Sequence, residues 1–307
     1  ILIASVLLIL GTLTWRQARG YRNITTLWRT ILVHNPNSFL AHNNLGMELA
    51  AQGELKEAID HYKLALKARP DFPEAHNNLG LALFKQGKTD EAIAHYNAAL
   101  NLRPDMVDVY NNLGLARAKQ GNDKEALQLY KQALRQRSDY ALAYYNMANR
   151  FAAQGNIDDA TQNYKLALEA WPDYSDAHNN LANVLANRGD ISGAVFHYQM
   201  AIRAKPALPD AHINLANILI RQGKTDEAIR HYKLAIQAKP DSAETLNNLA
   251  NALAGQGNLD EAIQDYRLAL KIRPDFKEAH NNLGLALERQ GKTEEAIRQY
   301  KLGSQTH

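Results

Sequence analysis

Cysteine is missing from this chain of 307 residues. Its absence excludes disulfides, thiolate metal sites and cysteine nucleophiles, but it leaves the redox compartment open because exported proteins can also lack cysteine. The chain also has little excess of positive over negative charge. The net charge is only +3, and basic residues alternate with acids except just after an apolar run at the N-terminus. Such a balance is typical of a solvated mixed surface, so we expect no nucleic-acid partner.

Catalytic motifs are missing as well. The sequence contains no H-E-x-x-H metal motif, no glycine-rich phosphate loop and no nucleophile elbow. We therefore expect no enzyme activity in this segment, no small-molecule cofactor and no metal site.

One long apolar run is present. Residues 1–15, ILIASVLLILGTLTW, carry no charge and are followed by three arginines within residues 16–22. Trp15 and Tyr21 stand where a membrane interface favours aromatic residues. At roughly 1.5 Å per residue the run covers about 22 Å of the roughly 30 Å hydrocarbon core. We interpret it as the C-terminal part of a transmembrane helix of a longer protein; a signal peptide or single anchor, or a buried core helix, are the alternatives. Residues 16–38 are then a juxtamembrane linker and capping helix.

The rest of the chain is built on a repeat. AHNNLG occupies residues 41–46 and returns at 75–80 and 279–284, with the near-copy AHNNLA at 177–182. Aligning these copies gives a period of 34 residues without an insertion. We predict that residues 39–307 form eight repeats, which begin at Phe39, Pro73, Val107, Ala141, Ser175, Pro209, Ala243 and Lys277.

Each repeat carries the signals of two helices and two turns. An apolar-periodic segment ends at a glycine, and a second one begins with acids and, in most repeats, ends near a proline. Position 8 of the repeat is always Gly or Ala, position 20 is always Ala, and position 24 is always Tyr. Small residues let helices approach closely, and a tyrosine ring fills the space beyond them. We assign these positions to the core; the tyrosines are Tyr62, Tyr96, Tyr130, Tyr164, Tyr198, Tyr232, Tyr266 and Tyr300.

With Leu-Gly, Ala, Tyr, Ala and Pro at these offsets, the chain resembles the tetratricopeptide repeat family. The resemblance implies an all-α fold in which antiparallel helix pairs stack into a right-handed superhelix, with the first helices lining a concave face. Trp28 and Pro36 fall one period before Tyr62 and Pro70. The segment 24–33 is therefore predicted to be an N-terminal capping helix of a degenerate half repeat.

Asparagine at position 6 is present in every repeat. At about 100° per residue, positions 4, 7, 8 and 11 form the core stripe, whereas position 6 faces the groove. We expect that packing does not require asparagine here, and its helix propensity is poor. Recent duplication is the alternative explanation, but neighbouring positions 10 and 13 have diverged freely. We therefore favour a functional row made of Asn44, Asn78, Asn112, Asn146, Asn180, Asn214, Asn248 and Asn282.

A carboxamide carries one acceptor and two donors, so it can pair with the C=O and N–H of a foreign backbone whatever that backbone's side chains are. Roughly three extended residues cover about 10 Å, close to the 8 to 10 Å between packed helices, so successive asparagines can grip one peptide. Position 9 adds a second row, and Tyr145 at position 5 is a candidate anchor. The second row consists of Asn149, Asn183, Asn217 and Asn251.

Acids at position 2 and bases at position 13 flank the asparagine row. They either bias which peptide is chosen or only keep the surface solvated, and the second reading is favoured. The acids are Glu74, Asp108, Asp176, Asp210, Glu244 and Glu278, and the bases are Lys85, Lys119, Arg221 and Arg289.

The asparagine row, with its NNLG and NLAN motifs, is similar to that in the repeat superhelix of protein O-GlcNAc transferases. That resemblance implies that the position 6 asparagines hold substrate polypeptide, although the catalytic domain of that family is absent from this chain. Chaperone-binding members of the repeat family instead clamp a terminal carboxylate with lysine at position 5 and bases at positions 2 and 6. Those residues are not present here, so binding of chaperone tails is not expected.

The junction RNITTLWRTILVHNPNSFLAHNNLG resembles that of membrane glycosyltransferases of the protein O-mannosyltransferase type, which carry such repeats C-terminally. It implies a periplasmic or lumenal location, where the lone acceptor motif at Asn23 would matter. The arginines after the apolar run favour the cytoplasm instead. Both sides of the membrane stay open.

The sequence thus predicts a membrane-anchored, non-catalytic scaffold that binds extended polypeptide in its concave groove. One alternative is the substrate-recruiting arm of a membrane glycosyltransferase whose catalytic half lies upstream. The other is a structural module that assembles through its convex face. Histidines recur at positions 4 and 23, which repetition alone explains.

Overall fold

The computed structural model describes residues 24–305, and this part of the chain is entirely helical, without a strand. The predicted membrane segment, residues 1–15, lies outside the described residues. Within residues 24–305, no helix is long and apolar enough to span a bilayer.

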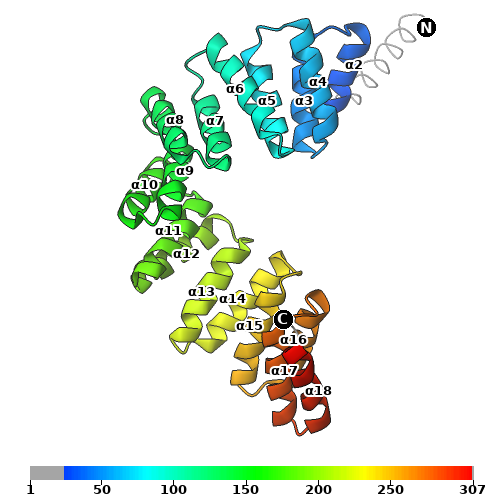
Figure 1. Cartoon of the computed structure of the whole chain (residues 1–307), viewed down its shortest axis with the longest axis vertical. Coiled ribbons are helices and arrows are strands. Elements are labelled where there is room, and N and C mark those ends of the chain that lie inside the picture. Colours follow the sequence, from blue (N-terminus) through cyan, green and yellow to red (C-terminus); the bar gives the residue numbers. More distant parts are fainter. Residues whose placement is uncertain (1–23, 306–307) are drawn as a thin grey trace, which may run out of the picture. The chain divides into compact units, whose positions relative to one another are not determined.

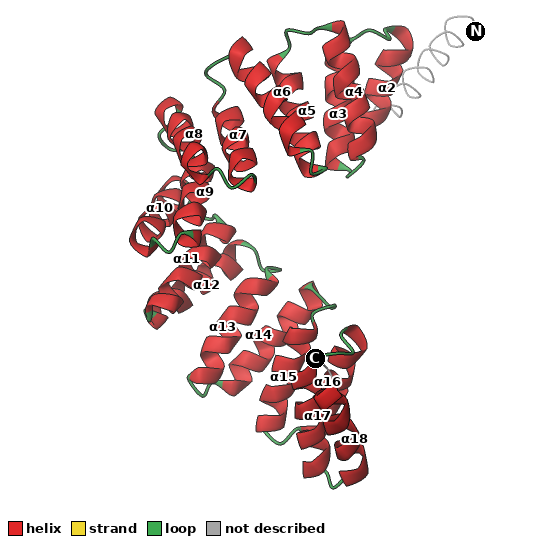
Figure 2. Ribbon diagram, viewed as in Figure 1, coloured by secondary structure: helices red, strands yellow, loops and turns green. Residues whose placement is uncertain are grey.

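The chain divides into two compact units, Ile1–Arg150 and Phe151–His307, each a row of antiparallel helix pairs (Figures 1 and 2). The described helices of unit one are α2 (Ile24–His34), α3 (Phe39–Ala51), α4 (Leu55–Ala68), α5 (Pro73–Lys85), α6 (Thr89–Leu102), α7 (Val107–Lys119) and α8 (Asp123–Gln136), followed by α9 (Ala141–Ala153), which ends just past the boundary. Those of unit two are α10 (Ile157–Ala170), α11 (Ser175–Arg188), α12 (Ile191–Ala204), α13 (Pro209–Arg221), α14 (Thr225–Ala238), α15 (Ala243–Gly255), α16 (Leu259–Ile272), α17 (Lys277–Arg289) and α18 (Thr293–Gln305). The right-handed superhelix stays a prediction.

Local signals fix where the helices end. Gly121 follows α7 with a φ of 81°, a left-handed conformation that glycine adopts without a Cβ penalty. At the start of α15, the Ser242 hydroxyl accepts the backbone N–H of Thr245. Pro209 begins α13, where a missing backbone N–H removes no helical hydrogen bond.

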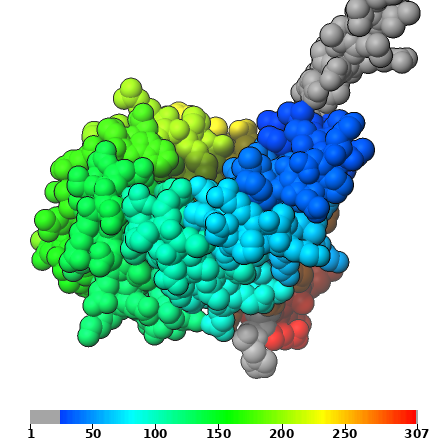
Figure 3. Space-filling model, turned by 90° about the horizontal axis from the view of Figure 1, so that it is seen from above, coloured from blue at the N-terminus to red at the C-terminus, as the bar shows by residue number. Residues whose placement is uncertain are grey.

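Helix α2 covers the open end of the first repeat. Trp28 and Leu32 pack against the core of unit one, and the Gln52 amide donates to Thr25 Oγ1 at 3.1 Å. In the space-filling view its surface continues into that of α3 and α4 (Figure 3). The helix therefore shields apolar side chains that a free repeat end would expose.

Exposed ion pairs link second helices of neighbouring repeats. A base at position 25 reaches an acid at position 19 of the next repeat, and α2 makes the equivalent contact with α4. The pairs are Arg29–Glu57 at 3.0 Å, Lys233–Glu261 at 3.6 Å and Arg267–Glu295 at 3.0 Å.

The tyrosine ring at position 24 packs against position 8 of the same repeat. Where that residue is glycine the contact is very close: a Cβ added to Gly114 would lie 2.5 Å from Cε1 of Tyr130. Such a Cβ would also crowd the tyrosine ring at Gly46, Gly80 and Gly284. The ring is almost fully buried in these repeats of unit one, which leaves no room for it to retreat.

Position 9 changes together with position 8. Repeats with Gly at position 8 carry Met or Leu at position 9, and repeats with Ala at position 8 carry Asn there. In unit two, the tyrosine hydroxyl donates to that asparagine. The bonds are Tyr198 to Asn183 Oδ1 at 2.5 Å, Tyr232 to Asn217 Oδ1 at 2.6 Å and Tyr266 to Asn251 Oδ1 at 2.6 Å.

In unit one the Gly-type repeats give the phenol no such acceptor. The hydroxyls of Tyr96 and Tyr130 are buried without a hydrogen-bond partner among the described residues. The structure therefore contains two kinds of repeat: one gains the closest helix contact, and the other satisfies the phenol.

Histidines at positions 4 and 23 form pairs inside the repeats. His178 Nε2 lies 2.9 Å from the carbonyl oxygen of Pro172, and so carries the proton it donates. Its Nδ1 then accepts from Nδ1 of His197 at 2.9 Å. Burial is the main cause that lowers the pKa of His197, to about 4, and the neighbouring His178 lowers it further. The pairs His42–His61, His76–His95 and His212–His231 repeat this arrangement.

We predict that Gly114→Ala destabilises unit one by about 1–3 kcal/mol, because the new methyl group overpacks against Tyr130. The double variant Gly114→Ala/Leu115→Asn recreates the Ala-Asn pair of other repeats and gives the Tyr130 hydroxyl an acceptor. It is expected to recover part of the loss. Thermal unfolding of the four members of this cycle measures the coupling, and a double variant no better than the sum of the singles contradicts it.

We also predict that stability falls as the pH drops from 6.5 towards 4, because folded His197 binds its proton less readily than the unfolded chain does. The stability is complete above the unfolded pKa and is lost as pH falls through the folded one. His197→Gln is a matched variant, since Gln299 occupies this position beside His280. Its melting temperature is expected to depend less steeply on pH than that of the unmodified chain. Equal slopes would refute the assignment.

Candidate functional site

The position 6 asparagines of unit one join neighbouring first helices. Three of them donate the amide nitrogen to the position 5 asparagine of the preceding repeat, across α3, α5, α7 and α9, whereas Asn44 accepts from Asn43 at 3.3 Å. The bonds are Asn78 to Asn43 at 3.0 Å, Asn112 to Asn77 at 3.1 Å and Asn146 to Asn111 at 2.8 Å.

In unit two the pattern varies. Asn282 donates to Asn247 at 3.2 Å as in unit one, whereas Asn214 reaches Asn183 at 2.9 Å instead. Asn248 makes no hydrogen bond within the described part of the chain. The preceding repeat carries Ile213 at position 5, and an aliphatic side chain cannot accept one.

The expectation that packing does not require these asparagines is therefore wrong. Five of them bond to the preceding repeat, a role that the pattern within a single repeat does not reveal; these are Asn78, Asn112, Asn146, Asn214 and Asn282. They are not sealed by it, however, since every member of the row except Asn146 is half-buried. After one N–H is used, an amide such as that of Asn112 still has a second N–H and both oxygen lone pairs to offer.

The second row, at position 9, differs in what it can offer. The Oδ1 atoms of Asn183, Asn217 and Asn251 accept the tyrosine hydroxyls described above, so their NH₂ groups remain as donors. Burial raises the pKa of Tyr232 to about 12, which keeps the phenol a neutral donor. Sequence reasoning missed this contact, although the joint change at positions 8 and 9 was a usable signal.

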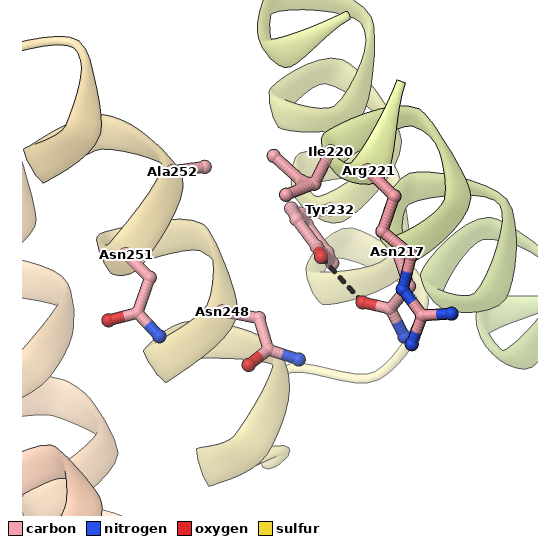
Figure 4. Close-up of a pocket in the computed structure, with 7 residues that line it drawn as sticks. All are labelled: Asn217, Ile220, Arg221, Tyr232, Asn248, Asn251 and Ala252. Carbon is pink, nitrogen blue, oxygen red and sulfur yellow. Dashed lines mark hydrogen bonds between the residues drawn. The ribbon is translucent and has the colours of Figure 1, made fainter. Parts of the chain in front are cut away.

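A pocket of about 310 Å³ lies between α13 and α15 in unit two (Figure 4). It combines both asparagine rows with a base from position 13. Its lining residues are Asn217, Ile220, Arg221, Tyr232, Asn248, Asn251 and Ala252.

An equivalent pocket of about 200 Å³ lies in unit one. Lys119 and Asn146 take the places of Arg221 and Asn248, and Asn149 contributes from position 9. The buried hydroxyl of Tyr130 belongs to a residue of this lining. Each unit thus brings predicted site residues together around a polar hollow.

The acids at position 2 are partly engaged within their own repeats. Arg103 pairs with Glu74 at 2.7 Å, and the Tyr140 hydroxyl donates to Asp108 at 2.7 Å. Arg273 pairs in the same way with Glu244.

The bases at position 13 differ among themselves. Arg289 donates to the carbonyl oxygen of Ala254 at 2.8 Å, and Lys119 lies over the ring of Phe84. Arg221 makes no ion pair among the described residues and lines the pocket instead.

Tyr145 is half-buried at position 5 of α9. Most other repeats place an asparagine there that accepts from the next repeat, so the ring interrupts that row. Its role as an anchor stays a prediction.

The described residues form no cluster that could bind a metal ion. No group of three or more His, Asp or Glu side chains could hold a metal ion within residues 24–305. The paired histidines instead donate to backbone carbonyl oxygens and to one another.

Comparison with known families gives two matches along the chain. The family described as "TPR repeat" matches residues 46–87, 80–121, 117–149, 216–257 and 251–291, and "Tetratricopeptide repeat" matches residues 145–209. No curated protein matches the sequence.

Several solved structures share the fold. One, titled "Crystal structure of APC/C hetero-tetramer Cut9-Hcn1", is 19% identical with a TM-score of 0.64; the match covers 86% of this chain and 52% of that one. The chain thus spans about half the length of that relative. The structure of pilF from Pseudomonas aeruginosa is 21% identical, with a TM-score of 0.62 and 72% and 97% coverage. That of MamA is 22% identical, with a TM-score of 0.50 and 52% and 94% coverage.

At these identities the solved structures support the fold alone. The family matches span more than half of the chain, and the stacked helix pairs of both units agree with them. This chain therefore belongs to the tetratricopeptide repeat family.

Proposed function

We propose that each unit binds extended polypeptide along its position 6 asparagines, and that the chain is a protein-interaction scaffold. The observation that carries the proposal is the unused hydrogen-bonding capacity of a half-buried amide row. One N–H and one C=O per rung match what an extended backbone presents. Side chains of the guest then point away from the row, which makes binding tolerant of sequence.

The bonds between repeats support this proposal. An isolated asparagine side chain must give up rotamer freedom when it binds a ligand. Asn112 has already done so, because its bond to Asn77 fixes the amide plane before a peptide arrives. The row is thus preorganised, and less of the binding free energy is spent on ordering side chains.

The substrate-recruiting arm of a membrane glycosyltransferase is the more specific form of this proposal. It is supported by the resemblance of the asparagine row to that of O-GlcNAc transferases and by the junction at residues 22–46. Attachment to a membrane through residues 1–15, on a side that is still open, belongs to the same proposal. A scaffold and a recruiting arm would use the same groove.

Assembly through the opposite face is the second candidate function. Leucines at position 26 form an exposed row on α14, α16 and α18 of unit two, and 45%, 49% and 45% of the surfaces of Leu234, Leu268 and Leu302 are accessible. Exposed apolar rows of this kind occur at docking surfaces.

We predict that Asn112→Ala lowers peptide affinity about tenfold, the effect of losing roughly one good hydrogen-bond pair. Fluorescence anisotropy can measure this with a panel of labelled, unstructured peptides. A length of about twelve residues spans four rungs at roughly 10 Å per rung and 3.3 Å per residue.

Asn77→Ala is the matched control. It removes the same bond between repeats but leaves the groove-facing amide of Asn112 in place. Both variants are expected to lose a similar stability, about 0.5–1.5 kcal/mol. Only Asn112→Ala should lose most of its binding. Equal affinities for the two variants would mean that the row is purely structural, and loss of an interaction in a Leu268→Ser variant instead would favour the convex face.

A further inference from the structure

We propose that the pocket between α13 and α15 is a carboxylate-binding subsite, which selects an acidic group in the polypeptide bound along unit two. This inference rests on the proposed function and adds a chemical preference to it. The preference comes from three features of the pocket: its N–H donors, one missing bond between repeats and a positive charge that makes no ion pair within residues 24–305.

The donors come from both helices. Asn217 and Asn251 have their oxygens engaged by Tyr232 and Tyr266, at 2.6 Å in each case. Because each amide is held by its oxygen, its NH₂ group is the part left to face a ligand. In Figure 4 the amide nitrogens of Asn248 and Asn251 point towards the side of the pocket where Asn217 and Arg221 lie.

Asn248 can offer both of its N–H groups to a ligand because Ile213 occupies position 5 of the preceding repeat. In the repeats where position 5 is asparagine, the next position 6 amide is generally drawn into the bond between repeats, as Asn282 is by Asn247 at 3.2 Å. Ile213 removes that acceptor, so both N–H groups of Asn248 stay available. The bond between repeats is thus missing at this pocket, on its donor side.

The positive charge at the pocket also favours a carboxylate. Arg221 is exposed at the edge of the pocket, makes no ion pair within residues 24–305, and no acidic side chain lines the hollow. A carboxylate has two oxygens that accept several hydrogen bonds, and charge-assisted bonds to guanidinium are among the stronger ones. A basic side chain offers these donors no acceptor and a neutral amide offers one uncharged oxygen, whereas a carboxylate offers two charged oxygens, and about 310 Å³ is ample room for it.

The equivalent position in the last repeat shows that this is not a property of every position 13 base. The Arg289 guanidinium donates to the carbonyl oxygen of Ala254 at 2.8 Å, so this group is already engaged within the protein. Arg221→Gln and Arg289→Gln therefore remove the same charge from the same repeat position, but only the first removes it from a pocket.

The test compares three synthetic host peptides on the full chain. They have the same unstructured, neutral sequence with amidated ends and carry Asp, Asn or Lys at one central place. A fourth peptide has Asn at that place and a free C-terminal carboxylate, which separates a side-chain acid from a chain end. We expect the Asp peptide to bind about tenfold more tightly than the Asn peptide, the gain typical of one charge-assisted bond.

Arg221→Gln is expected to abolish the preference for Asp, and Arg289→Gln to preserve it. Ile213→Asn, a residue that this position carries in most repeats, should weaken the preference by engaging Asn248 again. Equal binding of Asp and Asn peptides to the unmodified chain, or a preference that survives Arg221→Gln, would overturn the subsite while leaving the proposed groove intact. Tighter binding of only the free-terminus peptide would overturn selection of a side chain and assign the subsite to chain ends. If no peptide binds, the proposed function fails and the subsite falls with it.

Discussion

The contact between the tyrosine ring at position 24 and the small residue at position 8 sets the geometry of each repeat. Where position 8 is glycine, as at Gly114, the ring lies so close that even one methyl group would collide with it. Where it is alanine, the phenol instead reaches position 9, as Tyr232 reaches Asn217. Because this contact sets the spacing of the two helices, it also sets where the asparagines of the first helix lie. The packing of the core and the position of the asparagines therefore depend on the same contact.

The asparagines link neighbouring repeats, and under the proposed function they would also bind polypeptide. An amide has more hydrogen-bonding capacity than a single contact uses, so Asn112 can link two repeats and still face a guest. The bond between repeats gives a physical reason for a poor helix former at position 6. It also means that the loss of one such residue has to be judged on both stability and affinity before its role is assigned.

The helical architecture could be predicted from the sequence because its signals are local and repeated: a glycine after each first helix, small residues at fixed offsets and a tyrosine in every copy. The position 6 row was found by its phase on the helix. The bonds from Asn78 to Asn43 and from Asn214 to Asn183 were not, because they join residues about one period apart and depend on the distance between stacked helices. The sequence also did not show that Asn248 lacks a partner within residues 24–305. Ile213 matters only once it is known that position 5 of one repeat accepts a hydrogen bond from position 6 of the next.

The two edges of a repeat stack are fastened by different chemistry. First helices are tied by neutral amide pairs that are half-buried, whereas second helices are tied by exposed ion pairs such as Arg267–Glu295 at 3.0 Å. Dissolved salt screens the second kind far more than the first. Concentrated salt should therefore weaken the links between second helices while the links between first helices hold, so that the two sides of a repeat stack differ in their response to ionic strength.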